Sequence, residues 1–174
     1  QPAELSVGRL CRRASAQSVN RIAGQAVNRS VSVVSKSTRV PRKLVKQRAR
    51  IRRATVSKPR ALIRVNRGNL PAIKLGTASV RLSRRKRDKS GASSVLRIGP
   101  FRFPGAFIQQ LANGRWHVLR RTTRNRYPIE VVSIPLAVPL TEAFRAELPR
   151  LMDERMPEVM RQNLQNQLRL ILSR

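Results

Sequence analysis

The side chains that could carry out catalysis are few in this sequence. Its acidic residues cluster only at Asp153, Glu154 and Glu158. Glu154 and Glu158 would share one face of a helix, whereas a two-metal site needs carboxylates that converge from separate elements. We therefore expect a surface helix face here and no metal site.

His117 and Cys11 are the single histidine and the single cysteine of the chain. This excludes a histidine-based metal site, most catalytic triads and an internal disulfide. Trp116 and His117 fall on a predicted strand, where lone aromatic residues usually belong to the core or to an interface, and Cys11 falls on an apolar helix stripe that favours the core. Gly114 and Gly105 look like turn residues, so they do not indicate a phosphate-binding loop. These residues predict a protein that is not an enzyme and that uses no metal or cofactor.

Basic residues are the strongest chemical signal in the chain. Lys and Arg number 38 and Asp and Glu number 8, which gives a formal net charge of +30 over 174 residues. Residues 129–174 carry six bases and six acids, so the whole excess lies in residues 1–128. Such an excess implies a polyanionic partner or a place in a large assembly, whereas the neutral segment suggests packing on protein.

The bases gather in three clusters. Residues 39–60 hold ten of them without an acid, and the other clusters span residues 81–89 and 120–126. A single cluster could be a solvated face, but three on so small a chain would repel one another without counter-charge. With only six aromatic residues, contact with phosphates is favoured over base stacking. The candidates to face a polyanion or an acidic partner are Arg42, Lys43, Lys46, Arg50, Arg53, Arg84, Arg85 and Lys86.

Two helices and a small sheet are expected to position these residues. Apolar spacing predicts an amphipathic helix over residues 5–34, and the β-branched and hydroxyl residues that follow predict fraying toward Thr38. Pro41 suits the first turn of a short basic helix that would run to about Arg53. Strand-like runs then predict a small antiparallel sheet between residues 61 and 121, with residues 84–94 as a loop.

One hairpin is expected within this sheet. Asn113 and Gly114 separate the strand-like residues 107–111 and 116–119. An Asn-Gly pair in this setting predicts a type I′ turn, which needs positive φ at both residues.

The end of the chain is predicted to be helical from Thr141, as a cap, to about residue 172, with kinks near Pro149 and Pro157. Its apolar stripe is too long for a small sheet to cover, so we expect part of it to contact a neighbouring subunit or a partner protein. The candidates for this interface are Phe144, Leu148, Leu164, Leu168 and Ile171.

The pattern as a whole predicts an α+β fold: a long N-terminal helix, a short basic helix, a small antiparallel β-sheet with a hairpin, and a long C-terminal helix. We expect one domain over residues 1–174, with helices at about 5–53, the sheet at about 61–121 and the last helix at about 141–172. No apolar run approaches the ~20 residues of a membrane helix, so no membrane partner is expected.

Several segments of the sequence also resemble a known family. They are RKLVKQRAR (42–50), VNRGNLP (65–71), IKLG (73–76), PGAFIQQL (104–111), NGRWHV (113–118), NRYPI (125–129), IPLAVPLT (134–141) and QNQLR (165–169). Together they are similar to the minor tail protein Z family of lambda-like phages. The resemblance covers nearly all of the chain from about Val19 onward.

This resemblance implies a structural tail completion protein at the head-proximal end of a long, non-contractile tail. It implies a homo-oligomer, a six-subunit ring around a DNA channel, with no catalytic residues to carry over. The implied partners are the tail terminator, tail tube and head–tail joining proteins, together with genomic DNA in the channel. The protein would then be found in the virion tail, and in the host cytoplasm during assembly.

Composition leaves other functions open. A ribosomal-type protein that binds nucleic acid without sequence preference is the main alternative, and a nuclease is a distant third. Sedimentation separates the first two, because a ribosomal protein travels with ribosomal subunits whereas a tail protein travels with tails or virions.

Overall fold

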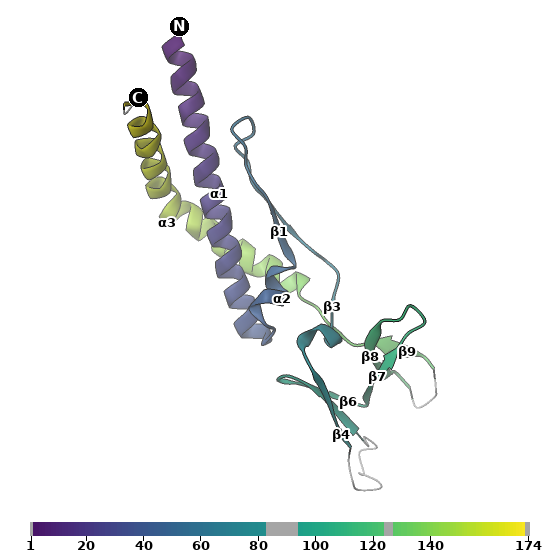
Figure 1. Cartoon of the computed structure of the whole chain (residues 1–174). Helices are drawn as coiled ribbons and strands as arrows, with labels where there is room; N and C mark the ends of the chain where they lie inside the picture. The colour runs from purple at the N-terminus through teal and green to yellow at the C-terminus, as the bar shows by residue number, and fades with distance from the viewer. Residues whose placement is uncertain (1, 83–93, 124–126, 173–174) are drawn as a thin grey trace. The chain divides into compact units, whose positions relative to one another are not determined.

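The computed structural model describes residues 2–82, 94–123 and 127–172. Long helices begin and end the described chain, and short strands lie between them, so the expected α+β class is confirmed (Figure 1). The elements are α1 (Pro2–Thr38), α2 (Arg42–Lys46), β1 (Ala49–Arg52), β2 (Leu62–Val65), β3 (Leu70–Pro71), the 3₁₀ turn η1 (Ala72–Leu75), β4 (Ala78–Leu82), β5 (Ser94–Ile98), β6 (Phe101–Pro104), β7 (Ala106–Gln110), β8 (Trp116–Arg121), β9 (Ile129–Val131), β10 (Ser133–Ile134) and α3 (Ala137–Leu172).

These elements form two compact units, and the single domain expected over residues 1–174 stays a prediction. The first, here called the helical unit, contains residues up to 66 and from 137 onward. The second, the sheet unit, contains residues 67–136.

Helix α1 is longer than the sequence predicted. Its apolar residues recur every three to four positions and bury one side, with Ile22, Ala26 and Val31 almost fully covered. The predicted fraying before Thr38 is wrong. The hydroxyl of Thr38 donates a hydrogen bond to the Val34 carbonyl at 2.6 Å, as Ser37 does at 3.1 Å, so the last turn is held by its own side chains.

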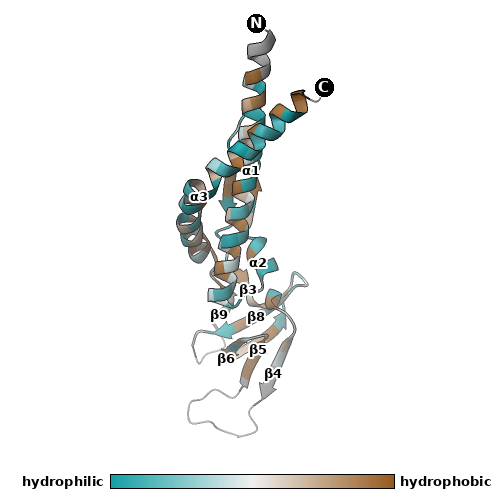
Figure 2. Ribbon diagram, turned by 90° about the vertical axis from the view of Figure 1, so that its left-hand side faces the viewer, coloured by the Kyte–Doolittle hydropathy of each residue, from teal (hydrophilic) through white to brown (hydrophobic). Residues whose placement is uncertain are grey.

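Helix α3 packs along α1 and forms the core of the helical unit. Leu151 and Val159 of α3 meet Ile22 and Ala26 of α1 in a fully buried cluster. Polar side chains continue this interface, as Asn163 donates to the Ser18 hydroxyl at 2.9 Å. Apolar and polar residues are interspersed along both long helices (Figure 2).

The start of α3 differs from the prediction, whereas its two prolines lie inside the helix as expected. The helix begins at Ala137, and Thr141 is no cap, because its hydroxyl donates to the Ala137 carbonyl at 2.8 Å inside the first turns. Pro149 and Pro157 lie inside a continuous helix without ending it. The ribbon of α3 changes direction part-way along (Figure 1), as interior prolines favour.

The short basic helix also ends earlier than predicted. Helix α2 stops at Lys46, and residues 49–52 form strand β1, which pairs antiparallel with β2. Placing Arg50 and Arg53 on a helix was therefore wrong. These residues alternate in burial: Ala49 and Ile51 are half-buried, whereas Arg50 and Arg52 are exposed. A strand places successive side chains on opposite faces, so it fits this pattern and a helix does not.

The sheet unit contains three small antiparallel sheets with the orders β10-β3, β4-β5-β6 and β7-β8-β9. Their buried residues include Leu96, Ile98, Val118 and Leu136. The prediction of antiparallel strands is confirmed, but strands continue past residue 121 as β9 and β10. Residues 84–93 of the predicted loop lie outside the described residues.

The β7–β8 hairpin exists, but its turn is not type I′. Positive φ occurs at Gly114, at 73°, and not at Asn113. Gly114 N–H donates to the Leu111 carbonyl at 2.8 Å, and Leu111 N–H donates to the Arg115 carbonyl at 3.0 Å. The loop therefore has three residues, a type I turn followed by a left-handed glycine.

Candidate nucleic-acid interface

Helix α2 presents three of the predicted basic residues to solvent. Arg42, Lys43 and Lys46 are all exposed, whereas Val45 is fully buried and fixes the helix to the helical unit. Val45 is the buried residue of this five-residue helix, so the side of the helix that carries the bases stays accessible to solvent. The side chains expected to face a polyanion here are therefore accessible.

The β1–β2 ribbon places further arginines on one face. Arg50 is the direct cross-strand neighbour of Arg64, and Arg52 is that of Leu62, and all four side chains are exposed. The opposite face carries Ile63, which packs on the buried core formed by α1 and α3. The strand alternation thus sends the apolar residues inward and the arginines outward.

Hydrogen bonds hold this ribbon in place. The Asn20 side chain on α1 donates to the Ala54 carbonyl at 2.9 Å and accepts from the Ala54 N–H at 2.7 Å. At the tip, Thr55 and Lys58 exchange backbone hydrogen bonds at 3.0 and 3.1 Å. Arg53 is exposed beside this anchor, next to Ala54. The arginines therefore stand on a fixed support.

Among the described residues, the bases of α2 and the ribbon form no ion pair with an acid. The sequence has no Asp or Glu between Glu4 and Asp88. Within the described part of the chain, the ion pairs are Arg29 with Glu147, at 3.9 Å, and Arg161 with Glu158. Neither pair involves α2 or the ribbon, so this surface can attract an external anion.

The other two basic clusters contribute less to a described site. Arg84, Arg85 and Lys86 lie outside the described residues. In the third cluster, Arg120 pairs across strands with Glu130, and the Arg121 guanidinium lies 5.5 Å from the centre of the Phe107 ring. The arginines brought together on one surface are those of the helical unit.

Most of the predicted interface residues on α3 are accessible, with one exception. Phe144 is 9% exposed and packs inside its own unit, so it is not available to a neighbour. Leu164 is half-buried, and Leu148, Leu168 and Ile171 are exposed by 37%, 51% and 50%. The exposed apolar residues concentrate in the last turns of α3, where brown segments lie among teal ones in Figure 2.

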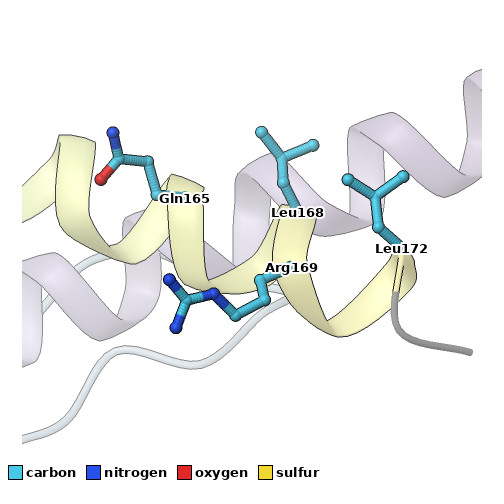
Figure 3. Close-up of a pocket in the computed structure, with 4 residues that line it drawn as sticks. All are labelled: Gln165, Leu168, Arg169 and Leu172. Carbon is cyan, nitrogen blue, oxygen red and sulfur yellow. The ribbon is translucent and has the colours of Figure 1, made fainter.

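A shallow groove marks the same end of α3. It is lined by Gln165, Leu168, Arg169 and Leu172. Leu168 and Leu172 point to one side of the helix together with Gln165, while Arg169 points away from them (Figure 3). This arrangement offers apolar contact with a polar border and no group suited to catalysis.

The other residues considered for chemistry do not form a reactive site. Cys11 is exposed, so its predicted place in the core is wrong. Trp116 is 56% exposed and His117 is half-buried, with its Nδ1 buried and without a hydrogen-bond partner. Within the described ranges, no three His, Cys, Asp or Glu side chains gather in a way that could hold a metal ion.

The sequence prediction missed Arg64, and it counted Arg52 in the basic cluster of residues 39–60 but not among the leading candidates. Both arginines lie on the ribbon face that Arg50 shares, and Arg64 comes from the second strand. The two-residue alternation of Arg50, Ile51 and Arg52 is the signal that could have found them.

Comparison with known proteins decides the family. Residues 6–174 match the model of the family described as prophage minor tail protein Z (GPZ). The chain belongs to this family. One relative, the "Tail completion protein" of Escherichia phage N15, is 80% identical over 162 residues, covering 93% of this chain and 88% of the relative. The "Tail completion protein Z" of Escherichia phage lambda is 54% identical over 169 residues, covering 92% of this chain and 88% of that protein.

No solved structure matches the chain with statistical significance. In this member of the minor tail protein Z family, the segment RKLVKQRAR spans α2 and the start of β1, where the exposed bases lie. In addition, none of the helices among the described residues has the length and apolar character needed to span a membrane.

Proposed function

We propose that this protein completes the tail of a phage, as a structural subunit of a ring at the head-proximal end of a long, non-contractile tail. Membership of the minor tail protein Z family is the observation that carries the proposal, and two relatives bear the name tail completion protein. The ring is a homo-oligomer, a hexamer, in contact with the tail terminator, tail tube and head–tail joining proteins. Its role is structural, in the virion tail, after assembly in the host cytoplasm.

The two accessible surfaces of the helical unit fit two different contacts in such a ring. The exposed bases of α2 and the ribbon suit the phosphates of DNA in the channel and would help to position that DNA. The apolar end of α3, with Leu168 and Ile171 exposed, suits contact with a second copy of the chain. A subunit of this kind joins protein on one side and nucleic acid on another.

The experiment that tests the proposal is complementation of a tail assembly reaction. Phage whose own tail completion gene is deleted would be supplied with this protein, and tails would be purified by sedimentation and imaged. We expect the protein to sediment with tails, to form a ring at their head-proximal end and to restore head joining. A protein that sediments with ribosomal subunits, or tails that join heads equally well without it, would contradict the proposal and favour the ribosomal-type alternative.

A further inference from the structure

We infer that the β1–β2 ribbon is a binding arm for the phosphate backbone of duplex DNA. The arm consists of Arg50 and Arg52 on β1, Arg64 on β2, and Lys58 and Arg60 at the tip. The inference rests on the proposed function, and it goes further by assigning direct binding of duplex DNA to named residues of the ribbon, with an acidic tail protein as the alternative that the test separates. It also adds Arg64, which lies outside the basic cluster of residues 39–60 expected from the sequence.

Two arginines lie opposite each other across the ribbon. Arg50 and Arg64 are direct cross-strand neighbours on the exposed face. Side chains in such a position have Cβ atoms ~5 Å apart, and like charges placed there destabilise the pair of strands. Among the described residues neither arginine forms an ion pair, so an external anion between the two guanidinium groups would remove the repulsion.

The composition of the exposed face is the second argument, and it favours nucleic acid over an acidic protein. Three of the four exposed side chains on the paired strands are arginines, and Leu62 is the fourth. Protein interfaces bury an apolar centre from which charged residues are depleted, whereas DNA interfaces are polar and strongly positive. This face is polar and strongly positive, as DNA interfaces are.

The shape and support of the ribbon are the third argument. A two-stranded ribbon is narrow enough to enter the major groove of DNA. The ribbon runs alongside α1, with its tip directed away from α2 (Figure 1). Asn20 and Ile63 fix it from behind, so the exposed arginines are presented without the entropy cost of ordering a free loop. Arginines that contact phosphates carry no sequence information, which predicts binding without sequence preference.

The test compares two triple variants of the full chain. Arg50→Gln, Arg52→Gln and Arg64→Gln remove the ribbon charges, and Arg9→Gln, Arg12→Gln and Arg13→Gln remove three exposed charges from α1 as a matched control. The probe is a short duplex of arbitrary sequence, titrated over a range of salt concentrations. We expect the ribbon variant to bind at least ~10-fold more weakly, with the slope of log K against log salt reduced by ~0.9 for each phosphate that the variant no longer neutralises. The control should keep most of the wild-type slope.

Three results would overturn the inference. One is equal weakening by the two triple variants, which would mean diffuse attraction by net charge and no binding arm. Another is a ribbon variant that binds duplex normally but no longer enters tails, which would point to an acidic tail protein. The third is a wild-type protein that enters tails and completes them without binding duplex, in which case the arm is wrong while the proposed function stands. Circular dichroism of each variant confirms the fold before binding is measured.

Discussion

Gly114 holds the turn of the β7–β8 hairpin in a conformation that other residues avoid. Its φ of 73° lies in the left-handed region, and nothing lies within 4 Å of an added Cβ, so the cost of a side chain comes from the backbone alone. We expect Gly114→Val to lower the free energy of unfolding by ~1–2 kcal/mol, as urea denaturation would measure. Gly114→Asn is the control and should cost less, because asparagine tolerates this region. Equal stability of all three proteins would contradict the turn described here.

At the scale of single residues, the sequence predicts local chemistry better than exposure. Cys11 was placed on an apolar stripe, yet it is exposed while its neighbour Leu10 is buried. Adjacent residues on a helix point ~100° apart, so the burial of one does not extend to the next. The hairpin glycine was predictable from Asn-Gly, but the choice between two- and three-residue loops depends on the register of the strands.

The link between α1 and the ribbon leads to a prediction at the scale of elements. Asn20 both donates to and accepts from the backbone of Ala54, and this pair of hydrogen bonds is partly buried. We expect Asn20→Ala to lower the free energy of unfolding by ~1–3 kcal/mol, because the Ala54 backbone groups lose their partner. Asn28→Ala, at an exposed position of the same helix, should change it little. Urea denaturation measures both, and hydrogen exchange at the Ala54 amide should become faster only in the first variant.

The long helices were predictable from the sequence and the first strand was not. The periodic apolar residues of α1 and α3 extend over many turns, so their signal is strong. Residues 47–53 carry four bases, which suit an exposed helix face as well as an exposed strand face. Pairing with β2, through Ile51 and Ile63, decides the matter, and these two residues are remote in sequence. Pro149 and Pro157 do not end α3, because packing against α1 keeps the helix continuous around them.

Charge is divided unevenly along the chain, and this bears on the proposed contact between copies. A net charge of +30 in each subunit opposes self-association, so contact between copies requires surfaces without that charge. The neutral segment of residues 129–174 contains such a surface at the end of α3. The division into a basic and a neutral segment can be read from the sequence, and Leu168 and Ile171 of the neutral segment are exposed. The sequence could not show that Phe144 is buried, because this depends on how α3 packs within its own chain.

The apolar end of α3 should therefore be needed for assembly and not for folding. Leu168→Asp with Ile171→Asp places two charges on exposed positions, so the melting temperature should stay within a few degrees of the wild type. Incorporation into tails should be abolished, because each carboxylate would have to be buried without a partner in the contact between copies. Arg155→Gln with Asn166→Asp changes the net charge equally at exposed polar positions and should leave incorporation intact. Tails that accept the double aspartate variant as readily as this control would show that the end of α3 is not the contact between subunits.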